Sequence, residues 1–291
     1  MNRKFLVVCA FALSFMFNGC GLFPGSTANG QDLKIESYNA LIQTVKPALV
    51  RVESINPEGL LILMYLESTG LPLTPELARK IKIAAGSGFI IDSTGIVITN
   101  RHVVRKGWHC IVRLLDGRAY TTTSIVVSQK EDIAVIKLAK VEKALPTVSF
   151  SKQEAKMGDI IFTIGRSPSF DLSFKTGVVS SVRRSLGRGE VNMQMTIPVN
   201  PGESGSAVFN TKGEIIGVVR AYIPSLRGIS LAVLGTSAEK VIKQLRVRIE
   251  KEEEKAAKEK AKTKENQGMG DFHHNDGYML LRNYQGILDR I

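Results

Sequence analysis

The feature that most constrains this chain is a succession of short β-rich segments that begins near Gly86. These segments recur about every ten residues and are separated by Gly, Pro, Asn and Asp, which are typical turn residues. They form two series: Gly88–Ile91, Ile96–Thr99, Cys110–Leu114, Ala119–Val127 and Ile133–Leu138, then Ile160–Ile164, Lys175–Val182, Asn192–Thr196, Ala207–Asn210, Ile215–Arg220 and Ile229–Val233. Many short strands with turns between them predict an all-β sandwich or a pair of barrels.

Other elements are expected on both sides of the β-rich region. Residues 37–45 have apolar side chains at helical spacing, 48–52 favour a strand, and the insertion 56–85 is expected to carry a short helix around 75–81.

A second helix is expected after the last strand. The Thr-Ser-Ala-Glu sequence at 236–239 is a capping-box pattern, and an apolar stripe of Val241, Ile242 and Leu245 follows it. The almost purely Lys, Glu and Ala sequence at 250–265 is typical of a helix exposed to solvent.

Composition narrows the functional classes. Of the 291 residues 44% are hydrophobic and only 3 are cysteines, which excludes a mostly disordered chain and a disulfide-dense scaffold. The net charge of +12 is compatible with nucleic acid or anionic lipid as a partner. Because acidic residues interleave with the basic ones at 250–265, we expect no nucleic-acid partner.

The first twenty residues have the pattern of a secretory signal. Arg3 and Lys4 precede an apolar stretch at 5–17, which is shorter than the about 20 residues of a transmembrane helix. The stretch ends in a small residue before Cys20, as in a bacterial lipoprotein signal whose cysteine receives the lipid. Cys20 is therefore the predicted lipidation site and membrane anchor. The alternative is ordinary cleavage after Ala28, which would discard Cys20.

Three of the β-rich segments each carry one residue suited to acyl transfer. His102 follows a strand, Asp132 precedes one, and Ser204 lies on a loop between glycines. A serine hydroxyl needs a base to take its proton, histidine can act as that base, and a buried carboxylate orients the imidazole. The loop allows the backbone N–H groups of Gly202 and Ser204 to bind an oxyanion. Each residue alone has an ordinary structural interpretation, but their order in three β-rich contexts favours a catalytic triad.

Four motifs carry a family resemblance. They are Thr99-Asn100-x-His102-Val103-Val104, Asp132-Ile133-Ala134-Val135, Asn200-Pro201-Gly202-x-Ser204-Gly205 and Gly213-Glu214-Ile215-Ile216-Gly217-Val218. Between Ser37 and Leu245 the chain resembles the HtrA (DegP-like) serine proteases of the chymotrypsin clan. The resemblance implies an all-β fold of two antiparallel β-barrels with a C-terminal helix and tail. It places His102, Asp132 and Ser204 in the cleft between the barrels.

The resemblance and the sequence pattern together give a domain plan. We expect a signal peptide at 1–19, a tether at 20–36, an N-terminal barrel with its leading helix at 37–146, a C-terminal barrel at 147–236, a charged helix at 237–266 and a tail at 267–291. No PDZ domain, which HtrA proteins usually carry, is recognised after the protease region.

Departures from the family affect the expected specificity. Glu203 stands where HtrA proteins have Asn, and Ser206 resembles the glutamyl endopeptidases. Those enzymes use a histidine at the position of Val219, so glutamyl specificity is not expected. The predicted substrate pocket is formed by apolar residues, with a basic residue at its rim, and favours a small or medium aliphatic side chain. Its residues are Pro198, Val218, Val219 and Arg220.

Other chemistry-bearing groups have simpler interpretations. His273 and His274 with Asp271 and Asp276 lack further ligands, so the tail is interpreted as solvated and no metal is expected. Cys110 is interpreted as a small buried hydrophobe. No organic cofactor is expected either.

The sequence therefore predicts an exported, membrane-anchored serine endopeptidase of a bacterial cell envelope, facing the periplasm or the exterior. Its expected substrates are polypeptides, in envelope protein quality control or processing. HtrA relatives often form trimers through N-terminal aromatic residues, but Phe23 and Tyr38 are too few to decide whether this chain is a homo-oligomer. The alternative function is a protease-fold binding or chaperone module with an unproductive site.

Overall fold

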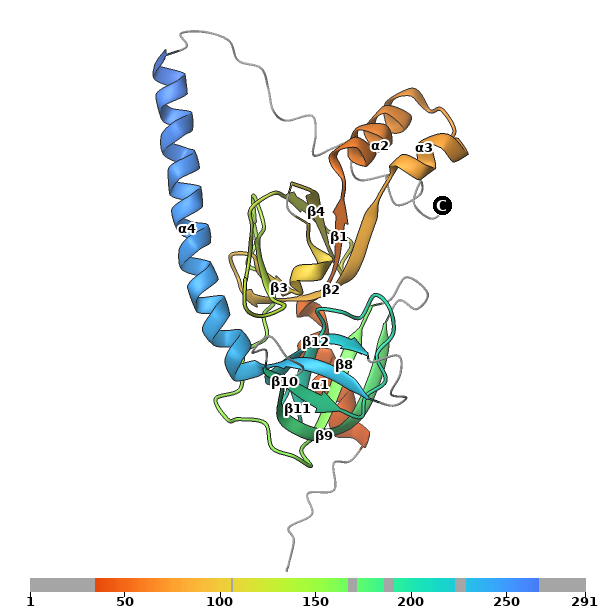
Figure 1. Ribbon diagram of the computed structural model, residues 1–291, viewed down its shortest axis with the longest axis vertical. Coiled ribbons are helices and arrows are strands. Elements are labelled where there is room, and N and C mark those ends of the chain that lie inside the picture. The colour runs from red at the N-terminus through yellow and green to blue at the C-terminus, as the bar shows by residue number, and fades with distance from the viewer. Residues whose placement is uncertain (1–34, 106, 167–171, 186–190, 223–228, 267–291) are drawn as a thin grey trace, which may run out of the picture. The chain divides into compact units, whose positions relative to one another are not determined.

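Two antiparallel β-structures follow each other along the chain (Figure 1). The computed structural model describes residues 35–105, 107–166, 172–185, 191–222 and 229–266. The chain divides into the units Met1–Tyr38 and Asn39–Ile291, and the larger unit contains both β-structures. Helix α1 (Ile35–Val45) leads through the 3₁₀ turn η1 (Lys46–Ala48) into the first strand.

The first β-structure is a seven-stranded sheet in the order β5-β4-β1-β2-β3-β7-β6. Its strands are β1 (Leu49–Ile55), β2 (Ile83–Asp92), β3 (Ile96–Thr99), β4 (His109–Leu114), β5 (Ala119–Thr122), β6 (Ile125–Val127) and β7 (Ala134–Lys137). Buried aliphatic side chains on one face, including Val52, Ile90 and Ile136, form its core.

The second β-structure is a closed barrel in the order β10-β13-β12-β11-β8-β9. Its strands are β8 (Ile160–Gly165), β9 (Ser173–Ser185), β10 (Val191–Met195), β11 (Ala207–Asn210), β12 (Ile215–Tyr222) and β13 (Ser230–Leu234). A buried apolar cluster that includes Met193, Val208 and Val219 fills the barrel.

The predicted all-β, chymotrypsin-like class is confirmed, with one difference in closure. The barrel at the C-terminal side is closed, whereas the described ladder of the first sheet ends at β5 and β6. The single predicted run Ala119–Val127 divides into these two edge strands. The Ser124 N–H donates to Thr122 Oγ1 at 2.9 Å, so a local turn interrupts the run. The chain then passes from the edge beside β4 to the edge beside β7.

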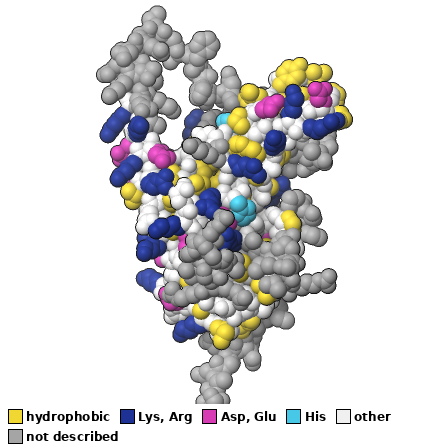
Figure 2. Space-filling view, in the orientation of Figure 1, with side chains coloured by type: hydrophobic (Ala, Val, Ile, Leu, Met, Phe, Trp, Pro, Cys, Tyr) yellow, Lys and Arg dark blue, Asp and Glu magenta, His cyan; other side chains and the backbone are white. Residues whose placement is uncertain are grey.

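The insertion between β1 and β2 forms two helices, α2 (Pro57–Thr69) and α3 (Pro75–Lys80). The sequence pattern predicts α3 but misses α2, because α2 is apolar on several faces and has no helical periodicity. The usual boundary signals are nevertheless present. Asn56 precedes the helix, Pro57 lies in its first turn, and Gly70, in the left-handed conformation, ends the helix. Leu63 is buried while Leu61 is 67% exposed. Hydrophobic side chains accordingly gather on the surface of this region (Figure 2).

Helix α4 (Gly235–Asn266) follows β13 directly and contacts β6 and β7 of the sheet as well as β12 and β13 of the barrel. Its buried side chains are Ala238, Ile242, Leu245 and Ile249, which share one face of the helix. No helix in the described ranges is long and apolar enough to cross a membrane.

Candidate active site

The histidine of the site is held by the turn that follows β3. Asn100 is extended and precedes η2 (Arg101–Val103), which carries His102. The Asn100 side-chain amide donates to the Asp132 carbonyl at 2.8 Å, so it links this turn to the bend before β7. The Asn100 side chain thereby holds the backbone of a residue 32 positions later in the sequence.

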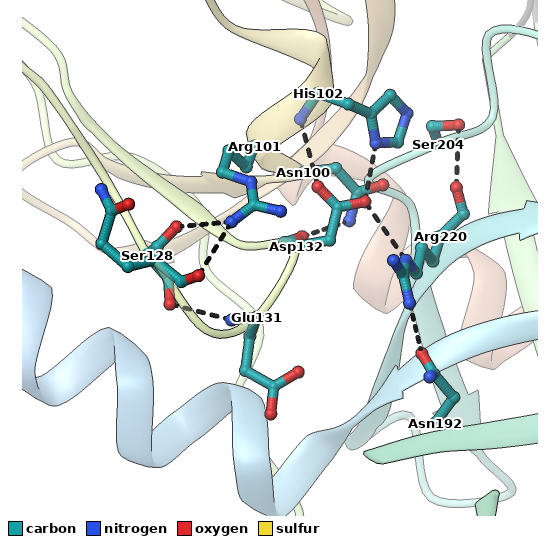
Figure 3. Close-up of polar contacts among 10 residues, drawn as sticks. Asn100, Arg101, His102, Ser128, Glu131, Asp132, Asn192, Ser204 and Arg220 are labelled. Carbon is teal, nitrogen blue, oxygen red and sulfur yellow. Dashed lines mark hydrogen bonds and ion pairs between the residues drawn. The ribbon is translucent and has the colours of Figure 1, made fainter. Parts of the chain in front are cut away.

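Asp132 receives two hydrogen bonds from His102 (Figure 3). Oδ2 lies 2.7 Å from His102 Nδ1, and Oδ1 accepts from the His102 backbone N–H at 3.1 Å. Burial by itself raises the pKa of the Asp132 carboxyl, but the hydrogen bonds and charge of His102, with the nearby Arg220 guanidinium, outweigh burial and hold that pKa below its usual value. Asp132 is therefore an anion that keeps a proton on Nδ1 and leaves Nε2 able to accept one.

Ser204 follows a tight turn. The Glu203 N–H donates to the Asn200 carbonyl at 3.1 Å, and Gly202 has a φ of +92°, so the four residues form a type II turn that requires glycine at its third position. Among the described residues, no acceptor binds the backbone N–H of Gly202 or Ser204. These are the two N–H groups that the sequence pattern predicts to bind an oxyanion.

Strand β2 anchors this loop through Ser87, a residue that motif reasoning leaves without a role. The Ser87 N–H donates to the Ser204 carbonyl at 2.8 Å, and its hydroxyl donates to the Gly202 carbonyl at 3.0 Å. The loop of the barrel is thus fastened to the sheet on both sides of Glu203. The small polar side chain between Gly86 and Gly88 is the only local signal for this contact.

The Ser204 hydroxyl does not point at the imidazole in this structure. Ser204 Oγ donates to the backbone carbonyl of Arg220 at 3.2 Å (Figure 3). Among the hydrogen bonds of the described residues, none joins Ser204 to His102. For Ser204 to give a proton to Nε2, its hydroxyl would first have to rotate away from the Arg220 carbonyl.

A cavity of about 430 Å³ joins the three residues. Its lining consists of Arg101, His102, Asp132, Val199, Asn200, Pro201, Ser204 and Arg220. Of the predicted pocket residues, Arg220 lines this cavity, whereas Pro198, Val218 and Val219 do not. Val218 and Val219 are fully buried, and Val219 belongs to the core of the barrel. Next to Ser204 the cavity is instead lined by Val199, Asn200 and Pro201, at the start of the turn that leads to the serine.

Arg220 has a role that sequence reasoning misses. Its Nε lies 3.6 Å from Asp132 Oδ2, and a terminal nitrogen donates to Asn192 Oδ1 at 3.1 Å. The guanidinium therefore links the Asp132 carboxylate to Asn192 of β10. In the sequence, Arg220 is visible only as a charged residue at the end of an apolar strand segment. This pattern does not identify Asp132 as its partner.

Cys20, the predicted lipidation site, lies outside the described residues. His273 and His274, which the sequence analysis interprets as part of a solvated tail, also lie outside them. Within the described ranges no group of His, Cys, Asp and Glu is placed to hold a metal ion. Cys110 is buried, and burial, with the Glu53 charge as a smaller cause, raises the pKa of its thiol. Its nucleophilic thiolate form is therefore disfavoured.

The part of the chain that contains His102, Asp132 and Ser204 is similar to known proteins. Residues 86–218 match the trypsin-like peptidase domain. The peptidase domain has relatives of the DegP and HtrA type. The chain is 34% identical over 182 residues to a protein of Ectopseudomonas mendocina (strain ymp) named "Probable periplasmic serine endoprotease DegP-like". This alignment covers 60% of the chain and 38% of the relative. The chain is 30% identical over 200 residues to the serine protease HTRA1 of Xenopus laevis, covering 66% and 39%.

Solved structures resemble the peptidase domain as well. The serine endoprotease from Yersinia pestis gives a TM-score of 0.54 at 24% identity and covers 72% of this chain and 66% of its own. The HtrA-type protease AlgW with tripeptide gives 0.57 at 24% identity, covering 71% and 62%. These likenesses establish the fold. The chain spans less than half the length of the two curated relatives. The family match and the relatives together support a serine endopeptidase.

Proposed function

We propose that this chain is a serine endopeptidase that hydrolyses peptide bonds through an acyl-enzyme on Ser204. The observation that carries the proposal is the 2.7 Å contact between His102 Nδ1 and Asp132 Oδ2 in the cavity that Ser204 also lines. A histidine held this way by a buried anion is prepared to act as a general base.

The reaction follows from the positions of these groups. His102 Nε2 would take the proton of Ser204 Oγ as that oxygen bonds to the carbonyl carbon of the scissile peptide. The N–H groups of Gly202 and Ser204 would bind the resulting oxyanion. His102 would then give its proton to the leaving nitrogen as the C–N bond breaks. A water molecule, activated by the same base, would release the acyl group and regenerate the serine.

One observation favours the alternative of a binding or chaperone module. The Ser204 hydroxyl bonds to the Arg220 carbonyl in place of the imidazole. If this arrangement persisted with substrate present, the serine would keep its proton. The chain would then bind an unfolded segment along the cavity without cleaving it.

Reaction with a fluorophosphonate probe separates the two functions, because it reports an activated serine. Ser206→Ala is a matched control, since the Ser206 hydroxyl is buried and has no hydrogen-bond partner among the described residues. We expect the unaltered chain and Ser206→Ala to be labelled and to hydrolyse casein. We expect folded Ser204→Ala to be unlabelled and to lose at least about a thousandfold in hydrolysis.

Two other results decide against the proposal. Undiminished casein hydrolysis by folded Ser204→Ala would exclude Ser204 as the nucleophile. An unaltered chain that binds unfolded casein, yet shows neither labelling nor hydrolysis, would establish the binding module.

We further propose that the protease is exported and acts on polypeptides in the envelope of a bacterium, held to a membrane by a lipid on Cys20. The signal pattern at 1–20 and the word periplasmic in the name of a relative support this location. Mass spectrometry of the mature N-terminus tests it. A lipidated Cys20 is expected, and an unmodified chain that begins near Asn29 would contradict it.

A further inference from the structure

The residue between the two oxyanion N–H groups is a buried acid. Glu203 is 1% exposed and lies directly between Gly202 and Ser204. A buried carboxylate is strongly unfavourable unless a cation and hydrogen-bond donors compensate it. The contacts of Glu203 therefore determine whether this loop keeps its conformation.

Lys175 of β9 supplies the compensating charge. Its Nζ lies 2.7 Å from both carboxylate oxygens of Glu203 and donates to the Pro198 carbonyl at 3.0 Å. The Asn200 N–H donates to Glu203 Oε2 at 2.7 Å. The lysine thus contacts Pro198, which precedes the turn, and Glu203, which ends it, while the carboxylate binds the first residue of the turn, Asn200.

Strand β8 leaves room for this acid. A Cβ atom on Gly165 would lie 2.6 Å from Glu203 Cγ, which is closer than real Cβ atoms approach other carbons. The side chain of Glu203 consequently packs against Gly165, and its carboxylate is held by Lys175 and by the Asn200 N–H.

We propose that Lys175 and Glu203 are positioning residues of the oxyanion site, and that their ion pair holds the N–H groups of Gly202 and Ser204 toward the cavity. The proposal rests on the proposed peptidase function and extends it. Lys175 touches no reacting atom and acts only through the loop. Without the lysine charge, the carboxylate would leave its buried position for solvent and change the backbone on both sides of itself.

Lys175→Met tests the pair, because it keeps the length of the side chain and removes its charge. The matched control is Lys243→Met, which removes an exposed lysine paired with Glu239 on α4. Four quantities are measured: kcat and KM for a peptide substrate, the rate of backbone hydrogen exchange at 199–206, and the melting temperature. Lys175→Met is expected to lose about 100-fold in kcat, the effect of losing one oxyanion donor, with little change in KM. Exchange at 199–206 should become at least about tenfold faster, because exchange reports local opening.

Lys175→Met/Glu203→Gln keeps the test decisive if the single variant fails to fold. The neutral pair buries no uncompensated charge, and the introduced glutamine side chain retains an acceptor for the Asn200 N–H. The double variant is expected to fold and, compared with Lys175→Met, to regain at least about tenfold in kcat and in protection from hydrogen exchange. If Lys175→Met does not fold, the double variant is compared with the unaltered chain, and its kcat is expected to be lower. A purely structural pair would instead lower the melting temperature and leave kcat of the folded protein unchanged.

The outcomes for the pair and for the peptidase are separable. If the unaltered chain hydrolyses peptides and the Lys175 variants match it in kcat and in exchange at 199–206, the pair has no positioning role. If the unaltered chain does not hydrolyse peptides, the proposed function fails, and exchange alone then decides whether the pair holds the loop. Unchanged exchange would overturn the proposal in that case too.

Discussion

Replacing Ile249 by alanine tests how α4 is attached to the domain. Ile249 is 1% exposed and lies on the same face of α4 as the buried residues Ala238, Ile242 and Leu245. Val247 is two residues earlier on the same helix and is 50% exposed, so Val247→Ala is the matched control.

The expected loss follows from burial. Removing a buried isoleucine side chain to alanine costs about 2–5 kcal/mol, and the lower part of that range applies where neighbours can close around the gap. A rim site on a surface helix belongs to that lower part, so we expect a loss of about 2–3 kcal/mol. In a domain of about 150–250 residues this corresponds to a fall in melting temperature of about 4–12 °C. Val247→Ala should change the unfolding free energy by no more than about 0.5 kcal/mol.

Urea unfolding at 25 °C, followed by circular dichroism, measures the difference. The slope of free energy against urea concentration should be equal in both variants, because both unfold the same domain. Peptide hydrolysis by the folded variants should be unchanged, since no residue of α4 lines the cavity. Equal stability of Ile249→Ala and Val247→Ala would refute the argument that this face anchors the helix.

Three further predictions concern the acid limit, the end of α4 and the insertion. The folded pKa of Asp132 lies below its usual 3.8, so its stabilising contribution is complete above that value and is lost as pH falls through the folded pKa. As the pH is lowered from 4.5 through the folded pKa, the unfolding free energy of Asp132→Asn, measured in urea, should therefore fall less than that of the unaltered chain. Equal falls in the two proteins would contradict this. Removal of 251–291 should leave peptide turnover unchanged and lower the unfolding free energy by no more than about 1 kcal/mol, because side chains 251–255 are exposed; a larger loss in either assay would make this segment part of the catalytic unit. Leu63→Ala should destabilise by about 2–4 kcal/mol and Leu61→Ala by less than about 0.5 kcal/mol, since the two side chains are 1% and 67% exposed; similar melting temperatures would contradict this.

Local sequence patterns were sufficient for most of the strands and for the turn before the serine. β-rich runs bounded by turn residues indicate strands because alternate side chains must be buried and the turns need particular backbone angles. Gly202 fits the one position of its turn that requires a positive φ. The motifs also select His102, Asp132 and Ser204, and these residues line one cavity.

Periodicity failed where burial does not follow one face of an element. Helix α2 is apolar almost throughout, so its sequence does not distinguish buried Leu63 from exposed Leu61. Ile249 extends the stripe of α4 by one turn beyond Leu245, but the charged sequence around it hides this continuation.

The sequence by itself determined the β-rich class, the order of the strands along the chain and the chemical groups available for acyl transfer. Only the tertiary structure decided which remote charges meet. Arg220 lies 88 residues after Asp132, and this pair forms across the boundary between the barrel and the seven-stranded sheet. Lys175 lies 28 residues before Glu203, and this pair forms because β8 pairs with both β9 and β11. Such contacts depend on sheet register and on the space left by residues such as Gly165, which are properties of the closed barrel and not of any local segment.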